Sequence, residues 1–447
     1  MSKYEIDIDK TYSFPSQLSI INYDNNIIIV APQFANWIVL VSQSQLDIFN
    51  YFSEGKTIKE TIENPLFDSN DINYVVTQMQ ARRFCNKHVH SSIDGSRSLH
   101  LYLTNKCNLL CPHCYMFSGK ANENELSTEE VIKLLHDYKT IAQGTRITIS
   151  GGEPSVHVDF EKIVRMASNM GLEVKLLTNG SLMTAELVEQ IANCINSVQI
   201  SIDGYSEISN RENRGEGHFR KALKAVDYFL EHGIETSIAI TPSIESLRNN
   251  PEDFISFAKE LLTKYEGKPF EVKFAEELSE GRKIKPSDKS NEEYSAIVRK
   301  IQNAIHGNQY DLITFVETMS RDVILNNCMF GVFSISSTGD VYFCPDIGKL
   351  MPIANIRTSS FVEIFEKSIK AEEATDIVKL QPCSNCELKY ICGGGCRTKE
   401  FPELVKRKSY DDINYSTIPP RNCSSTIKER FYKLMIDSNE YLYTSLD

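Results

Sequence analysis

Residues 98–115, SLHLYLTNKCNLLCPHCY, join a short strand pattern to three closely spaced cysteines. Apolar residues alternate through 98–104, which predicts a β-strand. The loop after it carries Cys107, Cys111 and Cys114 in the spacing Cys-x3-Cys-x2-Cys. Loops that follow the strands of α/β domains commonly build active sites. Three thiolates from one such loop predict an iron–sulfur cluster with one coordination position left open for a substrate or cofactor.

The alternative for this loop is a zinc knuckle in which His113 supplies the fourth ligand that a structural zinc site requires. His113 directly precedes Cys114, and this spacing is poorly suited to closing a tetrahedron. The iron–sulfur interpretation is therefore preferred.

Length and charge limit the classes of protein that the chain can belong to. At 447 residues it is long enough for two or three domains. A formal net charge of −12 argues against a general nucleic-acid-binding surface, which needs clustered Lys and Arg. The N-terminus lacks a signal-peptide pattern, and no apolar run reaches the ~18 residues of a spanning helix. We expect a cytoplasmic protein without nucleic-acid or membrane partners.

The chain contains twelve cysteines. A reducing compartment makes disulfides unfavourable and metal-bound or reactive thiolates more favourable. Cysteine spacing is therefore the main guide to function. Cys85 and Cys194 stand among apolar helical residues and are interpreted as buried structural thiols.

Strand and helix patterns alternate through residues 98–283, which predicts an α/β fold with a parallel sheet. The expected strands cover 98–104, 146–150, 173–179, 197–203, 234–241 and 270–277. Amphipathic segments at 127–142, 160–170, 184–195, 219–233 and 251–265 are the expected helices between them. Six such units make either a partial barrel or an open sheet.

The regions before residue 98 and after residue 283 do not continue this alternation of strands and helices. Residues 1–92 predict three short strands (18–23, 26–32 and 36–42) and then three helices, with Ser69 and Asp71 offering N-cap chemistry for the third helix. Residues 284–327 are expected to form bridging helices, and 328–430 are rich in cysteines and turns. A helix is expected over 424–446, and 431–447 is assigned as the last unit.

The cysteine loop, the aromatic Tyr115 directly after it and the six strand–helix units resemble the radical S-adenosylmethionine (SAM) enzymes. This resemblance implies a partial (β/α)6 TIM-like barrel. Residues Gly151, Gly152, Glu153 and Pro154 match the family segment that binds the amino group of SAM. Glycines allow close backbone approach to a ligand, and a carboxylate can accept from an ammonium. As an isolated tetrapeptide, the segment could equally be a surface turn.

Three further strand ends resemble the family's SAM pocket. Asn179 follows the third strand, and Ser201 and Asp203 end the fourth, where their hydroxyl and carboxylate groups could bind a ribose. Turn formation and helix capping are their alternatives. Arg214 resembles the arginine that pairs with the SAM carboxylate, against the alternative of a solvated surface arginine. Thr241 and Lys273 end the fifth and sixth strands and are weaker candidates for the pocket.

The C-terminal cysteine spacing matches the seven-cysteine SPASM extension of radical SAM enzymes. Such extensions hold two auxiliary 4Fe-4S clusters, so the resemblance implies three clusters in all. The second auxiliary cluster would take Cys383, Cys386, Cys392 and Cys423, and the first would take Cys328, Cys344 and Cys396. Family members with a fully ligated first cluster have another cysteine shortly upstream of position 328, but none occurs between Cys194 and Cys328. The open iron is interpreted as the binding site of a substrate thiolate, with a carboxylate, histidine or water ligand as the alternative.

The N-terminal region resembles the winged-helix-like element that recognises leader peptides by adding them as a strand to a sheet edge. A DNA-binding winged helix is the alternative, disfavoured by acidic helices. Together these features resemble the sactipeptide and ranthipeptide maturases. In such enzymes a 5'-deoxyadenosyl radical removes a hydrogen from a precursor peptide, whose cysteine thiolate then bonds to that carbon. Partners implied are a Cys-containing precursor peptide with a leader and an electron donor such as flavodoxin or ferredoxin.

The sequence leaves open other reactions of the same enzyme class. Carbon–carbon crosslinking, epimerisation and sulfatase formylglycine formation use the same chemistry class. A zinc-bearing peptide-binding protein without catalysis is the alternative from a different class. No general base is identified from the sequence.

Overall fold

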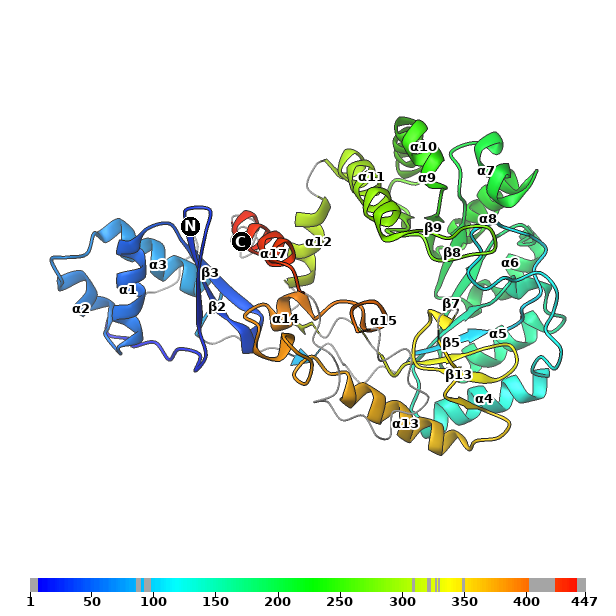
Figure 1. Ribbon diagram of the computed structural model, residues 1–447, viewed down its shortest axis with the longest axis horizontal. Helices are drawn as coiled ribbons and strands as arrows, with labels where there is room; N and C mark the ends of the chain where they lie inside the picture. The colour runs from blue at the N-terminus through cyan, green and yellow to red at the C-terminus, as the bar shows by residue number, and fades with distance from the viewer. Residues whose placement is uncertain are drawn as a thin grey trace.

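The computed structural model describes residues 7–85, 90–91, 98–307, 310–319, 323–325, 328, 330–347, 350–401 and 423–439. The molecule is elongated (Figure 1). The N-terminal sheet and helices form one end, the large parallel sheet with its helices forms the other, and the short helices α14 (Lys389–Cys392) and α15 (Arg397–Glu400) lie between them.

The N-terminal unit contains three antiparallel strands followed by three helices. The strands are β1 (Ser19–Tyr23), β2 (Asn26–Ala31) and β3 (Asn36–Leu40), paired in the order β1-β2-β3. The helices are α1 (Gln43–Ser53), α2 (Ile58–Glu63) and α3 (Ser69–Ala81). These elements lie where the sequence predicts them. The N-cap of α3, however, is neither Ser69 nor Asp71, the two residues predicted for it. Asp68 is the N-cap and accepts from the Asn70 amide at 2.8 Å, and Asp71 instead accepts from the side chain of Gln45.

The parallel sheet confirms the predicted α/β fold. Its strands are β5 (Ser98–Tyr102), β6 (Arg146–Ser150), β7 (Glu173–Thr178), β8 (Ser197–Ser201), β9 (Glu235–Ile240) and β10 (Phe270–Phe274). They pair in sequence order, each parallel to the next. The helices between them are α4 (Thr128–Ile141), α5 (Phe160–Asn169), α6 (Ala185–Ile191), α7 (Glu207–Arg214), α8 (His218–Glu231), α9 (Ile244–Asn249) and α10 (Pro251–Lys264).

The sheet continues beyond β5 into the cysteine-rich region, which the sequence did not predict. Strand β12 (Phe333–Ile335) pairs with β5 in parallel, and β13 (Asp340–Tyr342) and β14 (Ala354–Asn355) extend the sheet as antiparallel strands. Phe333 and Ile335 are buried in the same core as the six parallel strands. The cysteine-rich region therefore shares a sheet and a core with the domain before it.

The remaining described elements complete the fold. They are β4 (His90–Ser91) paired with β11 (Val323–Ile324), α11 (Asp288–His306), α12 (Tyr310–Met319), α13 (Phe361–Ala374), α14 (Lys389–Cys392), α15 (Arg397–Glu400) and α17 (Ser425–Asp437), with short 3-10 helices η1 (Pro32–Phe34), η2 (Pro154–Val156), η3 (Ala192–Cys194) and η5 (Cys383–Asn385). The bridging helices α11 and α12 occupy the predicted region. The C-terminal helix starts at Ser425, ahead of the boundary assigned at residue 431, and 440–447 lie outside the described residues.

A buried junction holds the N-terminal sheet against the C-terminal helix, which lie side by side in Figure 1. The Trp37 indole nitrogen donates to the Met435 carbonyl at 3.1 Å, and its ring packs 5.5 Å from that of Phe315. The Arg82 guanidinium also lies over the indole, 3.9 Å from the ring centroid. Leu388 and Ile391 join the same apolar cluster. One face of the N-terminal sheet is thus covered by residues from the C-terminal third of the chain.

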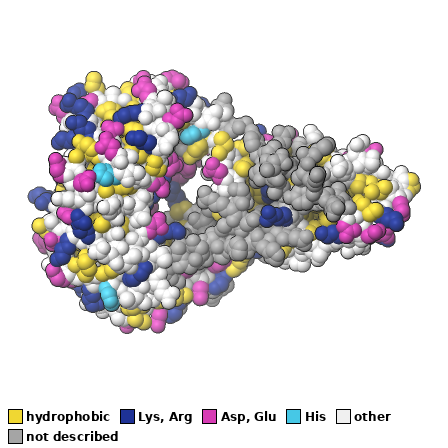
Figure 2. Space-filling model, turned by 180° about the vertical axis from the view of Figure 1, so that it is seen from behind, with side chains coloured by type: hydrophobic (Ala, Val, Ile, Leu, Met, Phe, Trp, Pro, Cys, Tyr) yellow, Lys and Arg dark blue, Asp and Glu magenta, His cyan; other side chains and the backbone are white. Residues whose placement is uncertain are grey.

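Surface charge is mixed. On the face drawn in Figure 2, Lys and Arg side chains are interspersed with Asp and Glu. Within the described part of the chain, no helix combines the length and apolar character needed to cross a bilayer.

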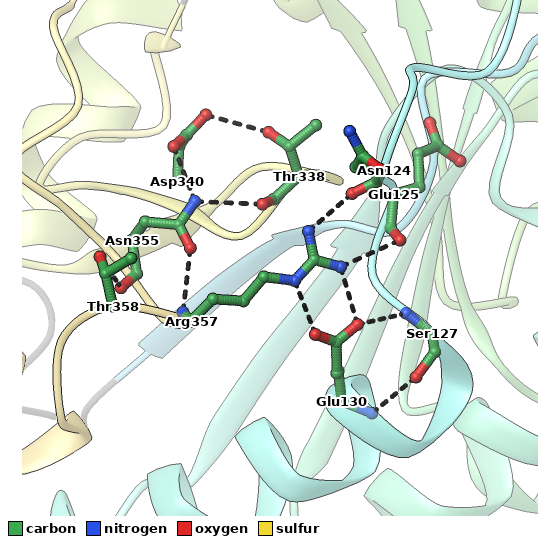
Figure 3. Close-up of polar contacts among 9 residues, drawn as sticks. All are labelled: Asn124, Glu125, Ser127, Glu130, Thr338, Asp340, Asn355, Arg357 and Thr358. Atoms are coloured by element: carbon green, nitrogen blue, oxygen red, sulfur yellow. Dashed lines mark hydrogen bonds and ion pairs between the residues drawn. The ribbon is translucent and has the colours of Figure 1, made fainter.

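A second junction joins the loop after β14 to the start of α4 (Figure 3). Arg357 donates to both carboxylate oxygens of Glu130, at 2.6 and 2.8 Å, and to the carbonyls of Asn124 and Glu125 at 2.8 and 3.2 Å. Glu130 also accepts from the Ser127 amide, which closes a capping box at the start of α4. The bonds to Arg357 are the largest cause lowering the pKa of Glu130, to about 2.

We expect the Arg357–Glu130 pair to couple the two segments modestly. Both side chains are about one-third exposed (35% and 36%), so a double-mutant cycle of Arg357→Ala and Glu130→Ala should give a coupling of at most about 1 kcal/mol at pH 7. Because the pKa is lowered on folding, this stability is present above pH 4.5 and is lost as the pH falls toward about 2. Thermal unfolding of the cluster-free chain at pH 7 and pH 3 measures it. A coupling unchanged at pH 3 would contradict this assignment.

Candidate active site

A cavity of about 360 Å³ opens at the carboxyl ends of the parallel strands. Its lining includes residues from the ends of β6 to β10 and from the cysteine loop after β5. Among the residues predicted for the site, it contains Cys107, Cys111, Cys114, Tyr115, Gly151, Gly152, Asn179, Ser201, Arg214 and Thr241. The volume is within the range of small-molecule sites. The structure therefore brings all three cysteines of the first loop together with most of the predicted SAM pocket.

The two glycines after β6 are required by contact between two protein segments. A Cβ at Gly152 would lie 2.4 Å from the Lys106 carbonyl oxygen, and one at Gly151 (φ +134°) would lie 2.4 Å from that of Thr104. The Gly152 amide donates to the Thr104 carbonyl at 2.8 Å, and the Glu153 amide donates to that of Lys106 at 2.9 Å. The glycines thus allow the loop after β6 to lie directly against the cysteine loop.

Glu153 and Pro154 are buried behind the cavity and do not belong to its lining. The Glu153 carboxylate accepts from the Thr178 hydroxyl at 2.8 Å, from the Asn179 amide at 2.7 Å and from the Ser155 hydroxyl at 2.6 Å. Burial raises the pKa of this carboxyl group. In this arrangement Glu153 connects the ends of β6 and β7, and its predicted contact with the SAM amino group stays a prediction.

Arg214 and Asp203 form a buried ion pair at the cavity wall. Arg214 donates to the two carboxylate oxygens at 2.5 and 3.2 Å, and one of these oxygens also accepts from the Thr241 amide at 3.1 Å. Asp203 itself is 1% exposed and does not line the cavity. Its carboxylate is therefore bonded to Arg214, whereas Ser201 lines the cavity, and the ribose contact predicted for these two residues stays a prediction.

His113 contacts the Asp203 carboxylate of this ion pair, with its Nε2 3.3 Å from the nearer oxygen. Burial lowers the pKa of this imidazole. No hydrogen-bond partner of its buried Nδ1 is found among the described residues. Among these residues, no three Cys, His, Asp or Glu side chains converge on a point that would suit one metal ion.

Sequence reasoning missed part of the lining. Gln199 on β8 and Glu277, Leu278 and Ser279 after β10 face the cavity. Their positions at strand ends are the signal that could have identified them. Lys273, in contrast, is not in the lining and pairs with Glu271 at 2.8 Å.

A second cavity, of about 330 Å³, is lined by Cys383, Cys386, Cys392 and Cys423. Lys389 and Lys428 also line it. The Leu388 amide donates to the Cys386 sulfur at 3.4 Å, and burial raises the pKa of the Cys386 thiol to about 11. These four cysteines are the ones expected for the second auxiliary cluster, and they come from segments about thirty residues apart.

Cys396 lies apart from that cavity and belongs to a third group. It is hydrogen-bonded to Cys328, which lowers the pKa of the Cys396 thiol. Burial raises the pKa of Cys344, and the nearby charges of Asp346 and Cys396 raise it further. The Thr398 hydroxyl lies 3.1 Å from the Cys396 sulfur. Cys328, Cys344 and Cys396 are thus neighbours, as expected for the first auxiliary cluster.

The third group lies beside the first cavity. Lys399, three residues after Cys396, forms an ion pair with Glu277, which lines the first cavity. Tyr115 lines the same cavity, and burial raises the pKa of its hydroxyl, with the charges of Asp346 and Cys344 adding to that effect.

The ten cysteines fit iron–sulfur clusters in their chemistry and placement. Burial raises the pKa of Cys107 and of Cys344 to about 11, so these thiols are protonated before a cluster binds and release protons when it does. The two other cysteines, Cys85 and Cys194, pack against hydrophobic cores. This agrees with a structural role.

Comparisons with known proteins agree with the site. Residues 101–258 match the radical SAM superfamily, and residues 327–387 match the SPASM iron–sulfur cluster-binding domain. The mycofactocin maturase MftC of Mycolicibacterium smegmatis is 27% identical over 322 residues, which are 69% of this chain and 80% of MftC. The AdoMet-dependent heme synthase of Methanosarcina barkeri is 29% identical over 325 residues, which are 67% of this chain and 90% of that protein.

Solved structures show the same fold. Native anSMEcpe with bound AdoMet has a TM-score of 0.56 at 19% identity, covering 78% of this chain and 100% of that one. Streptococcus suis SuiB bound to the precursor peptide SuiA has a TM-score of 0.50 at 17% identity, covering 91% of this chain and 100% of SuiB. The cysteine loop, the cavity, the parallel sheet and the sequence matches agree: this enzyme contains a radical SAM domain, matched over residues 101–258, followed by a SPASM iron–sulfur cluster-binding domain, matched over residues 327–387.

Proposed function

We propose that the protein matures a ribosomally made precursor peptide by joining a cysteine sulfur to a carbon of the same peptide. The single observation that carries this proposal is the third cysteine group. Cys328, Cys344 and Cys396 supply three thiols beside the first cavity, and no other cysteine lies between Cys194 and Cys328 to complete the set. A substrate thiol would complete a cluster there and be held next to the reacting carbon.

The chain's own residues bind and orient the reactants. Arg214, supported by Asp203, presents a fixed guanidinium at the cavity wall for the carboxylate of SAM. The ion pair between Lys399 and Glu277 holds the start of α15, and with it Cys396, against the cavity. With the three clusters bound, SAM supplies the radical that removes a hydrogen atom from the peptide. The thiol releases one proton, and formation of the carbon–sulfur bond from the carbon radical releases one electron, for which the cluster that Cys328, Cys344 and Cys396 would hold is the acceptor. With the hydrogen atom already removed, the peptide loses two hydrogens in total.

Strand β1 suits leader-peptide binding. Its residues alternate between half-buried and exposed, whereas β3 is buried throughout. Within the described ranges β1 pairs with β2 alone, so its other edge presents backbone groups to which a peptide can add as a strand. The relatives MftC, named a maturase, and SuiB, solved with a precursor peptide, support a peptide substrate. The winged-helix-like assignment, cytoplasmic location and flavodoxin or ferredoxin donor are part of the same proposal.

Coexpression with a candidate precursor peptide tests the proposal. We expect each crosslink to remove two hydrogens from the peptide mass and to protect one cysteine from alkylation. A carbon–carbon crosslink would give the same mass change with every thiol still alkylated, epimerisation would leave the mass unchanged, and formylglycine formation would remove the cysteine sulfur. Any of these three outcomes would reject the thioether product.

A further inference from the structure

Residues Gly281, Arg282 and Lys283, which follow β10, lie directly against the first cysteine loop and are here called the strap. The Lys283 amide donates to the Pro112 carbonyl at 2.8 Å, and the Arg282 amide donates to that of Cys114 at 3.3 Å. Two backbone bonds thus join segments about 170 residues apart.

The Arg282 side chain adds contacts to the same loop. Its Nη1 donates to the Cys111 carbonyl at 2.9 Å, and its Nη2 donates to the Ser118 carbonyl. The loop itself has few regular hydrogen bonds, among them Cys107 amide to Gly119 carbonyl at 3.0 Å and Cys114 amide to Cys111 carbonyl at 3.3 Å. A planar guanidinium with donors in fixed directions can hold two carbonyls of an irregular loop at a set separation, which the single ammonium group of lysine cannot do.

Gly281 makes this approach sterically feasible. A Cβ at this position would lie 2.5 Å from the His113 carbonyl carbon and 2.6 Å from its oxygen. The strap also closes on itself, because the Gly281 amide donates to the Ile284 carbonyl at 2.8 Å. Any larger residue at 281 must push the strap away from the cysteine loop.

We propose that Arg282 is a positioning residue for the SAM cluster. It holds the loop of Cys107, Cys111 and Cys114 in its cluster-binding shape before the cluster arrives. Only Glu280 separates the strap from Glu277, Leu278 and Ser279 in the cavity lining, so one continuous segment contacts both the cavity and the cysteine loop. This inference rests on the radical SAM domain and is independent of the peptide product.

Hydrogen exchange of the cluster-free chain tests the proposal without any catalytic readout. In Arg282→Gln, the amides of residues 107–119 should exchange about tenfold faster or more than in the wild type, because two charge-assisted hydrogen bonds are lost. Peptides from β6 to β9 should not change. The matched control is Arg248→Gln, which removes a bidentate arginine at 2.5 and 2.6 Å from Glu293 on the same domain but away from the cysteine loop. It should leave residues 107–119 at the wild-type rate.

Gly281→Ala is the second variant, since it keeps the Arg282 side chain and displaces the strap. It should accelerate the same amides, and Arg282→Lys should restore only part of the protection. After reconstitution, both Arg282→Gln and Gly281→Ala should lose the SAM-induced change in the electron paramagnetic resonance spectrum of the reduced SAM cluster. Signals of the auxiliary clusters should persist.

Two results would overturn the proposal. Wild-type exchange at 107–119 in Arg282→Gln, with an unchanged spectrum, would show that the loop holds its shape unaided. Equal acceleration across the whole parallel sheet would show that Arg282 stabilises the domain without positioning the loop.

Discussion

Replacing Cys396 with alanine is expected to abolish peptide crosslinking while reductive cleavage of SAM continues at close to the wild-type rate. Cys396 groups with Cys328 and Cys344, whereas the first cavity, where SAM is predicted to bind, is lined by a different set of cysteines. Losing one of three thiols should prevent that cluster from holding the substrate and leave the SAM cluster intact. Chromatography of 5'-deoxyadenosine and mass spectrometry of the coexpressed peptide measure the two activities separately.

Cys194→Ala is the matched control, because Cys194 packs against the hydrophobic core outside all three cysteine groups, and we expect it to keep both activities. Loss of SAM cleavage in a folded, cluster-loaded Cys396→Ala variant would contradict the proposed division of labour. Asp346→Asn examines the other candidate for the open position, a carboxylate, since Asp346 is two residues from Cys344. If that variant changed the electron paramagnetic resonance spectrum of the auxiliary clusters in the absence of peptide, Asp346, and not a substrate thiolate, would be the fourth ligand of the first auxiliary cluster.

Breaking the Asp203–Arg214 pair is expected to have the second large effect. In Asp203→Asn, Arg214 remains at the cavity wall with a side chain only 10% exposed and without the carboxylate that its Nε and Nη2 contact. Removing one partner of a buried pair costs about 3–5 kcal/mol. We expect a corresponding loss of stability and a fall of at least about 100-fold in affinity for SAM. Thermal unfolding and equilibrium binding of SAM to the reconstituted protein measure the two effects.

A double variant separates stability from binding. Asp203→Asn with Arg214→Gln leaves no buried charge, so it should recover much of the lost stability and still bind SAM weakly. Glu293→Gln, which breaks the exposed pair with Arg248, should change neither property by much. SAM affinity at the wild-type level in the double variant would show that Arg214 does not bind the ligand.

Much of the candidate site could be predicted from the sequence because its residues follow strands. Once 98–104, 146–150 and 173–179 are recognised as parallel strands, the residues after each must meet at one edge of the sheet. Cys107, Gly152 and Asn179 lie in one cavity for that reason. Glu277 could have been found in the same way, since it follows the sixth strand.

What the sequence could not predict depends on the direction of side chains and on contacts between distant segments. Glu153 and Asp203 stand at the expected strand ends, yet neither lines the cavity, and both carboxylates accept hydrogen bonds from protein donors. The pairing of β12 with β5 was likewise unexpected, because a three-residue strand carries too little pattern to indicate its partner.

The sequence by itself determined the α/β class, the order of the strands and the residues that can bind iron, because these depend on apolar periodicity and on cysteine spacing along one segment. Only the tertiary structure decided which groups face the cavity and what holds the first cysteine loop in place. In the sequence, Arg282 lies in a polar stretch, and nothing in that pattern distinguishes it from a surface arginine. Its contacts with the Cys111 and Ser118 carbonyls exist only because folding brings the segment after β10 against the loop after β5.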